Sequence, residues 1–318
     1  MYQRVYSLLY CGWENIRLFA GKMTDYVEHI QLHNQVRMPL LGLGTYRLKG
    51  EAATQPVRDA LNLGYRHIDT ASVYGNEQAI GDVVRYVTSD LNGTSIKRQD
   101  LFITTKLAPK DQGYVKATAA IDASIERLGG TPIDLFLIHW PGCGGMQLDD
   151  PAQATMRLGS WQALEKALTD GKVHAIGVSN FEPRHLTHLL ENATVVPHVN
   201  QIELHPACPQ PELLKLCKLH KIQIVAYASL GVGALLNHST VNRVASRRGH
   251  TPAQVLLRWG LQKGACVIPK ASSTERITEN YKVFGFELDS KDMAELDDIS
   301  KEYQKPQHFC WNPGTVKF

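Results

Sequence analysis

Short apolar runs alternate with amphipathic stretches along the chain from Met38 onward. The runs predict strands at Pro39–Leu43, Arg66–Asp69, Leu101–Lys106, Ile133–His139, Val173–Ser179, Val199–Gln201, Gln223–Tyr227 and Ala265–Ile268. The stretches between them predict helices at Ala52–Leu63, Glu77–Val87, Val115–Leu128, Met156–Thr169, Glu182–Leu190, Pro211–Leu219 and Pro252–Gln262. Periodicity alone does not distinguish a short buried strand from a piece of helix. Glycines that follow a predicted helix and precede a predicted strand, as helix C-caps do, distinguish the helices from the strands. They are Gly64, Gly130, Gly171 and Gly264.

Eight strands that each return through a helix form a parallel sheet. A closed (β/α)8 TIM barrel is the economical α/β arrangement, and one such domain can take ~250 residues or more. The alternative is an open doubly wound sheet, which would carry G-x-G-x-x-G after its first strand. Gly42-Leu43-Gly44 lacks the third glycine, and so does Gly231-Val232-Gly233, which also comes late in the chain. The sequence therefore predicts a single barrel domain over residues 23–318, including the C-terminal tail.

Charge and cysteine usage exclude several classes of partner. The chain has 34 Lys and Arg against 31 Asp and Glu, and these charges are scattered, whereas a nucleic-acid-binding face needs a basic cluster. No segment has the ~18 consecutive apolar residues of a membrane span. The 6 cysteines are far apart and show no zinc-binding spacing. We expect a cytoplasmic protein with reduced thiols that binds no nucleic acid, membrane or metal.

Residues 1–22 differ in character from the barrel sequence, being mildly basic and rich in Tyr, Leu and Phe. A secretory signal would have a cleaner apolar run and a small-residue cleavage site, and a mitochondrial one would have more Arg and Ser. We interpret this segment as an N-terminal extension upstream of a working start at Met23. Mitochondrial targeting is the alternative.

Polar residues gather where the predicted strands end, and in barrels this is where chemistry takes place. They are Asp69, Lys106, His139, Ser179, Asn180, Gln201, Tyr227 and Lys270, with Tyr74 in the loop after the second strand. Taken singly, each has an ordinary explanation as a helix cap, a core residue or an amphipathic filler. Their convergence on one end of a barrel favours a functional site.

Four of these residues suit proton donation to a carbonyl group. Tyr74 holds its proton at neutral pH and could release it to a developing alkoxide. An ammonium at Lys106 would stabilise the phenolate and lower its pKa, and Asp69 would hold Lys106 in place. His139 could donate a hydrogen bond to the substrate oxygen. Because no side chain supplies hydride, a cofactor is implied.

The later strand ends resemble a trough for such a cofactor. Tyr227 could stack on a nicotinamide ring, and a hydroxyl and two amides could bind its carboxamide; these belong to Ser179, Asn180 and Gln201. The backbone of Ser229-Leu230-Gly231 could approach a pyrophosphate. Lys270 and Arg276, near a predicted helix N-terminus, could bind a phosphate. The ordinary explanation is turn chemistry, with Ser272 or Ser273 as a helix N-cap.

Several ordered motifs resemble the signatures of the aldo-keto reductase family. They are Gly64-Tyr65-Arg66-His67-Ile68-Asp69-Thr70-Ala71, Tyr74-Gly75-Asn76-Glu77, Ile138-His139-Trp140-Pro141, Ile176-Gly177-Val178-Ser179-Asn180-Phe181, Val199-Asn200-Gln201 and Ile268-Pro269-Lys270. Together they cover roughly residues 31–313, which makes the resemblance far more specific than any lone pattern. The short tail from Phe309 to Pro313 is similar to that of the family's diketogluconate reductase and prostaglandin F synthase branch.

The resemblance implies an NADPH-dependent reductase of aldehydes and ketones with Tyr74 as general acid, supported by Lys106, Asp69 and His139. It implies that Lys270 and Arg276 bind the 2′-phosphate, so that NADP(H) is preferred over NAD(H). The other residues that it implies for the cofactor are Gly44, Thr45, Tyr46, Asp69, Ser179, Asn180, Gln201, Tyr227, Ser229, Leu230, Gly231, Ser272, Glu279 and Asn280. Two departures stand out. Ala271 replaces the usual Ser or Thr and removes a hydroxyl near the 2′-phosphate. His174 stands where Arg or Lys is common, and we interpret this as a surface change.

The substrate pocket is expected to be lined by Tyr46, His139, Trp140 and Trp311, with Cys143 from the long loop Pro141–Thr155. A short tail leaves such a pocket open to small carbonyl compounds of several kinds. Two other functions stay possible: a non-catalytic NADP(H)-binding sensor on the same fold, and a barrel hydrolase. The hydrolase would need a second acid or a histidine cluster that the strand ends do not offer. We expect a monomer, since no large apolar patch is evident on the helices.

Overall fold

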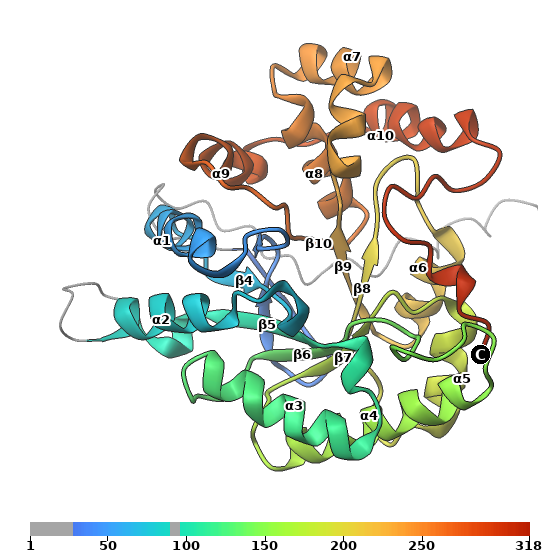
Figure 1. Cartoon of the computed structure of the whole chain (residues 1–318). Coiled ribbons are helices and arrows are strands. Elements are labelled where there is room, and N and C mark those ends of the chain that lie inside the picture. Colours follow the sequence, from blue (N-terminus) through green and yellow to red (C-terminus); the bar gives the residue numbers. More distant parts are fainter. Residues whose placement is uncertain (1–27, 90–95) are drawn as a thin grey trace, which may run out of the picture.

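The computed structural model describes residues 28–89 and 96–318. The predicted extension, residues 1–22, lies outside the described residues. A ring of helices surrounds a central sheet (Figure 1). None of the helices in the described ranges is long and apolar enough to span a membrane. The five cysteines in these ranges, from Cys143 to Cys310, form no disulfide with one another.

The central sheet contains eight parallel strands in a single order along the chain. They are β3 (Leu43–Gly44), β4 (His67–Asp69), β5 (Phe102–Leu107), β6 (Leu135–Ile138), β7 (Ile176–Ser179), β8 (Val199–Glu203), β9 (Gln223–Tyr227) and β10 (Cys266–Val267). Parallel bridges Leu41–Val267 and Gly44–Lys270 join the last strand to the first. The backbone N–H of Gly42 also donates to the carbonyl of Val267 at 2.9 Å. The sheet is therefore closed, and the predicted (β/α)8 barrel is confirmed.

Ten α-helices are present in the described residues, besides short 3₁₀ helices. They are α1 (Thr54–Leu63), α2 (Glu77–Thr88), α3 (Tyr114–Arg127), α4 (Ala152–Thr169), α5 (Pro183–Asn192), α6 (Pro211–Leu219), α7 (Ser239–Arg248), α8 (Pro252–Gln262), α9 (Thr274–Tyr281) and α10 (Ser290–Asp297). Gly64 ends α1 with a φ of 106°, as a left-handed C-cap. Two helices were not predicted, α7 and α10, and buried Asp292 of α10 joins them through ion pairs with Arg247 and Arg248.

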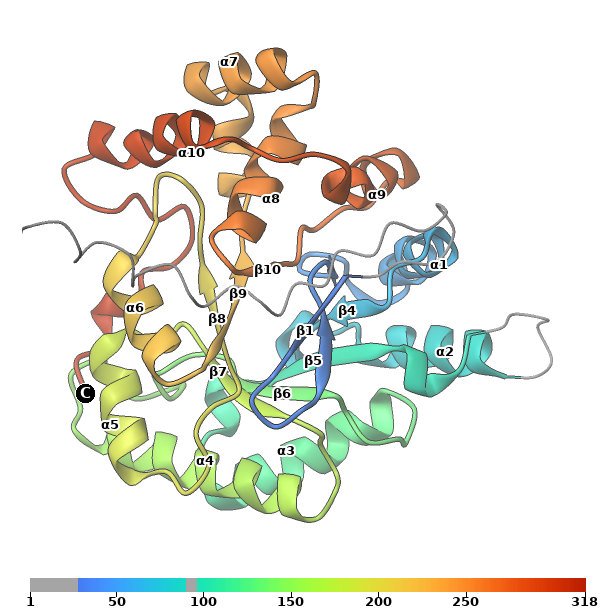
Figure 2. The ribbon, with the colours of Figure 1, turned by 180° about the vertical axis from the view of Figure 1, so that it is seen from behind.

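The first predicted strand, Pro39–Leu43, is wrong in its bounds. Pro39 instead ends β2 (Arg37–Pro39), which pairs antiparallel with β1 (His29–Gln31). This hairpin crosses the barrel on the side hidden in Figure 1 (Figure 2). Its Leu32 and Met38 pack against the apolar residues inside the barrel. The long loop is also shorter than predicted, because α4 begins at Ala152.

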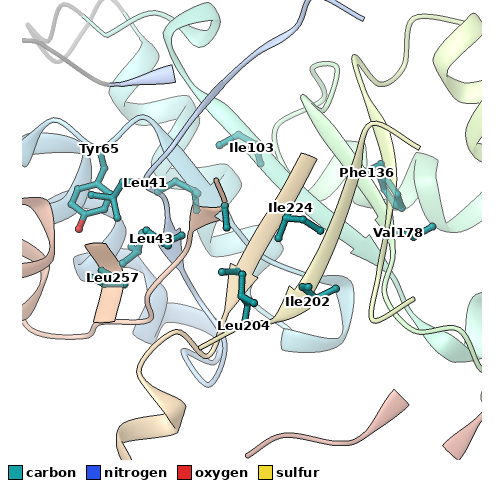
Figure 3. Close-up of a cluster of buried hydrophobic side chains, with 14 of the residues drawn as sticks. Leu41, Leu43, Tyr65, Ile103, Phe136, Val178, Ile202, Leu204, Ile224 and Leu257 are labelled. Atoms are coloured by element: carbon teal, nitrogen blue, oxygen red, sulfur yellow. The ribbon is translucent and has the colours of Figure 1, made fainter. Parts of the chain in front are cut away.

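Alternation along the strands divides the side chains between two environments. On β5, Phe102 belongs to the apolar cluster inside the barrel, whereas Ile103 and Leu107 pack in the larger cluster between sheet and helices. Figure 3 shows part of this larger cluster, with Ile103 on β5, Phe136 on β6 and Ile202 on β8. Inward-facing residues near the strands' C-terminal ends are polar, and they form the site.

Candidate active site

Strand alternation points polar side chains into the barrel, and their positions late in each strand place them at one end of its interior. On β5, Phe102, Thr104 and Lys106 share a face, so the apolar layer is followed by a hydroxyl and then by an ammonium. On β6 the inward positions Leu135 and Leu137 lead to His139, directly after the strand. Six predicted residues therefore lie within two residues of the C-terminal ends of neighbouring strands: Asp69, Lys106, His139, Ser179, Gln201 and Tyr227.

Lys106 and Asp69 form a buried ion pair. The Nζ atom of Lys106 donates to Asp69 Oδ1 at 2.6 Å and to the carbonyl of Thr70 at 2.8 Å. Lys106 is fully buried, and burial lowers the pKa of its ammonium, whereas the charge of Asp69 opposes that shift. The other carboxylate oxygen of Asp69 accepts from Gln201 Nε2 at 2.7 Å. The two charges are thus held in one geometry by hydrogen bonds from three strands.

Tyr74 lies above this pair, at the end of the short 3₁₀ helix Ser72–Tyr74. Its ring centroid lies 5.2 Å from Lys106 Nζ and 5.6 Å from the His139 ring centroid, so the four residues of the predicted catalytic set meet at the barrel mouth. Burial and the negative charge of Asp69 raise the pKa of Tyr74 well above 10. We expected Lys106 to lower this pKa, and the direction is the opposite because burial of the phenol dominates and the charge of Asp69 adds to it. The phenol therefore keeps its proton at neutral pH.

The imidazole of His139 is neutral in this setting. Burial and the nearby Lys106 ammonium lower its pKa to about 3. Its buried Nδ1 has no hydrogen-bond partner among the described residues. A neutral imidazole carries one N–H donor, and the edge-to-face contact with Tyr74 places this ring beside the phenol.

The predicted carboxamide-binding residues form their own hydrogen-bond chain. Tyr227 donates its hydroxyl to Asn180 Oδ1 at 2.6 Å, and Asn180 Nδ2 donates to the carbonyl of His139 at 2.9 Å. Asn180 has a φ of 65°, a left-handed conformation that Asn tolerates. Ser179 donates to the backbone of Gln201 at 2.9 Å. These contacts join β7, β8 and β9 beside the Lys106–Asp69 pair.

The predicted phosphate-binding residues surround the last strand and α9. Gly44 pairs with Lys270, and Thr45 donates its hydroxyl to the Asp69 carbonyl at 2.9 Å. Lys270, Ser272 and Arg276 are exposed, and neither cation has an ion-pair partner in residues 28–89 and 96–318. Ser273, rather than Ser272, is the N-cap of α9. Ser229, Leu230 and Gly231 follow β9, and Asn280 is buried on α9 beside half-buried Glu279.

Ala271 is 3 % exposed and packs in the core between sheet and helices. Its methyl group is therefore enclosed by apolar neighbours rather than open to the rim where Lys270 lies. His174 lies among residues that precede β7, with its side chain half exposed.

The substrate side of the mouth is aromatic. Tyr46 is 55 % exposed, and its ring centroid lies 5.2 Å from that of Tyr74. Trp311 is 84 % exposed and meets Trp140 edge to face at a centroid distance of 6.5 Å. Cys143 is largely buried, so only the other predicted pocket residues present open surface.

Two residues that shape this side were not predicted. Gln112 is buried and donates to the carbonyls of Trp140 and Gly142 at 2.8 and 2.9 Å, which fixes the start of the long loop. Glu203 ends β8, and its carboxylate binds the C-terminal tail. The signal for Glu203 was available, because it lies two residues after Gln201 and so shares its inward face. Gln112 lies in an irregular segment and had no such signal.

Comparison with known proteins agrees with the motifs. A model of the aldo/keto reductase family matches residues 40–301. The 9,11-endoperoxide prostaglandin H2 reductase of Trypanosoma cruzi (strain CL Brener) is 42% identical over 86% of this chain and 92% of its own length. The glyoxal reductase of Bacillus subtilis (strain 168) is 41% identical over 88% of this chain and 95% of its own.

Solved structures show the same relationship. Gox0644 in its apo form superposes with a TM-score of 0.82 at 35% identity, covering 92% of this chain and all (100%) of that one. A variant of Gox0644 crystallised in complex with NADPH gives a TM-score of 0.81 at 35% identity, with the same coverage of 92% and 100%. The closed barrel with tyrosine, lysine, aspartate and histidine at its mouth belongs to a class of oxidoreductase barrels. The chain belongs to the aldo/keto reductase family, and it is an oxidoreductase enzyme.

Proposed function

We propose that this protein reduces aldehydes and ketones to alcohols with NADPH, with Tyr74 as the proton donor. The observation that carries the proposal is the meeting of Tyr74 and His139 above the buried Lys106–Asp69 pair. NADPH, when bound, would supply hydride to the carbonyl carbon. The Tyr74 hydroxyl then gives its proton to the carbonyl oxygen, and the O–H bond of the alcohol forms as that of the phenol breaks. Lys106 stabilises the resulting phenolate, and neutral His139 orients the carbonyl.

The residues present fit this cofactor. Gln201 uses its Nε2 on Asp69, and its Oε1 can accept from the carboxamide beside Ser179 and Asn180. Lys270 and Arg276 are exposed cations close to the N-terminus of α9, where an anion is favoured. We propose that they bind the 2′-phosphate and that Ser229–Gly231, Ser272, Glu279 and Asn280 line the rest of the trough.

The test is a spectrophotometric assay of NADPH, and separately of NADH, with glyoxal, methylglyoxal, small aldehydes and quinones. α-Dicarbonyl compounds are included because one relative is a glyoxal reductase. We expect oxidation of NADPH well above that of NADH. If NADPH binds, as judged by fluorescence quenching, but no substrate is turned over, the sensor function replaces the reductase.

We further propose that residues 23–318 form the functional unit, a cytoplasmic monomer, and that residues 1–22 are an appended extension. A chain that starts at Met23 should then have the kcat and KM of the full chain. Elution from a size-exclusion column at the volume of a monomer, judged against mass standards, would support the monomer. A lower kcat or an insoluble product for the shorter chain would contradict the division.

A further inference from the structure

The C-terminal tail is attached to the barrel by one buried carboxylate that the proposed reaction does not use. Glu203 is 2 % exposed at the end of β8. Its Oε1 accepts from the backbone N–H groups of Phe309 at 2.7 Å and Cys310 at 3.2 Å. Its Oε2 accepts from His308 Nδ1 at 2.9 Å. Three consecutive tail residues are thus hydrogen-bonded to one side chain.

Histidine donors keep this carboxylate charged. His205 is fully buried, and its Nε2 also donates to Glu203 Oε1, at 3.1 Å. Burial alone would raise the pKa of Glu203, but the hydrogen bonds from His205, His308 and the Phe309 backbone hold it at about 2. A carboxylate with four donors is ionised at every pH at which the enzyme would work.

The bound segment contacts both halves of the site. The Phe309 ring lies so close to Gly231 that a Cβ atom at Gly231 would be 2.9 Å from Phe309 Cε2. Gly231 belongs to the loop assigned above to the pyrophosphate. On the other side, Trp311 follows directly and faces Trp140. A small cavity under the tail is lined by Glu203 and His308 together with Asn180 and Tyr227 of the carboxamide side.

The tail is also held beyond Trp311. Arg184 donates to the carbonyl of Gly314 at 2.8 Å, and His185 Nε2 donates to that of Val316 at 2.9 Å. Val316 itself is fully buried. Trp311 therefore lies on a short segment held on both sides. On the side before Trp311, Glu203 accepts three hydrogen bonds from the tail, beside one backbone hydrogen bond from Gln307 to Ala207 at 2.9 Å.

We propose that Glu203 is a positioning residue, which fixes tail residues 308–310 and thereby places Trp311 as a wall of the substrate pocket. This inference rests on the proposed reductase function. It extends that function by making selectivity for bulky, aromatic carbonyl compounds depend on a carboxylate outside the pocket. Glu203 does not take part in the hydride or proton transfer.

The attachment itself is tested by hydrogen exchange, which does not depend on activity. Glu203→Leu removes all acceptors at similar size, and Glu203→Gln keeps one oxygen but places an amide N–H against the donor of His308. We expect exchange of the Phe309 and Cys310 amides to rise about tenfold or more in Glu203→Leu, and less in Glu203→Gln. Asp292→Asn, which alters a buried carboxylate between α7 and α10, is the matched control and should leave tail exchange unchanged. Unchanged exchange in Glu203→Leu would overturn the proposal.

The consequence for selectivity is tested by kinetics with methylglyoxal and 2-naphthaldehyde. Glu203→Leu should raise KM for the naphthaldehyde about tenfold with kcat within about twofold, and should leave KM for methylglyoxal within about twofold. Trp311→Ala should have the same effect, and the double variant should be no worse than Trp311→Ala alone. Additive effects, or equal loss for both substrates, would overturn the role of Trp311. If the unaltered enzyme reduces neither these compounds nor any other carbonyl compound of the panel above, the proposed reductase function fails, and the exchange experiment still decides whether Glu203 holds the tail.

Discussion

At the barrel mouth, Lys106 is fully buried and its ammonium is bound by Asp69 and the Thr70 carbonyl, whereas at the opposite end of the proposed trough Lys270 and Arg276 are exposed to solvent. A buried ion pair is held in one geometry, since losing either partner leaves an uncompensated charge. Exposed cations remain hydrated and mobile until an anion binds them. The first arrangement suits a group that acts in the transition state, and the second suits a group that contributes affinity.

This difference predicts that substitutions at the mouth lower kcat, whereas substitutions at the outer end raise KM for the cofactor. A transition-state contribution appears in kcat, because it is absent from the ground state. A binding contribution that is equal in both states appears in KM alone. If both kinds of substitution changed the same constant, the mouth and the outer end of the trough would not differ in their contributions to catalysis and affinity.

The largest effect is expected for Tyr74→Phe, which removes the phenolic proton and little else. We expect kcat to fall by about 10³-fold, within the range of general acid catalysis, while the Kd of NADPH stays within about twofold. Stopped-flow turnover and fluorescence titration measure the two quantities. A variant with kcat near that of the unaltered enzyme would disprove the role of Tyr74, and Tyr46→Phe is the control for loss of a neighbouring hydroxyl.

A second prediction concerns the outer end. Replacing both Lys270 and Arg276 by Met should raise KM for NADPH by about 10- to 100-fold, since each removes a charge-assisted contact with phosphate. The KM for NADH and kcat with either cofactor should change little. The KM ratio of the two cofactors, measured at fixed ionic strength, gives the result. An equal rise in KM for NADH would show that these cations do not recognise the 2′-phosphate.

Physical reasons separate what the sequence could predict from what it could not. Residues near strand ends can be predicted, because alternation places Lys106, His139 and Gln201 inside the barrel and active sites of such barrels lie at the C-terminal ends of the strands. The hairpin β1–β2 was missed, since its strands have three residues each and one ends in proline. Helix α7 was missed because it buries only Val241, Val244 and Ala245 in an otherwise polar segment.

Contacts between segments far apart in the chain could not be predicted from the sequence. Nothing local to Glu203 indicates that it binds amides about a hundred positions later. The raised pKa of Tyr74 depends on how deeply the phenol is buried and on the nearby charge of Asp69. The positions of functional residues therefore followed from the pattern, whereas their electrostatic state required the packed structure.

A third prediction uses the electrostatics of the mouth. With its pKa lowered to about 3, His139 is neutral in the folded enzyme throughout pH 5–8, and the raised pKa of Tyr74 keeps the phenol protonated there. We expect kcat with NADPH to vary by less than about threefold over this range, with no step near the ordinary histidine pKa of about 6.5. A pH profile in buffers of constant ionic strength tests this. A tenfold fall between pH 7 and 5 would mean that the imidazole takes up a proton.

The smallest effect is expected for Ala271→Ser, which restores the hydroxyl that the family usually has at this position, next to the proposed 2′-phosphate site. Ala271 packs in the core at 3 % exposure, so an added hydroxyl meets apolar neighbours unless the chain after β10 shifts outward. An unpartnered buried hydroxyl costs about 1–3 kcal/mol. We therefore expect KM for NADPH to change by no more than about twofold, accompanied by a lower Tm. The Ala271→Gly variant controls for backbone loosening. A tenfold lower KM for NADPH with an unchanged Tm would show instead that this position faces the phosphate, and that the outer end is as closely packed around its ligand as the mouth is around Lys106.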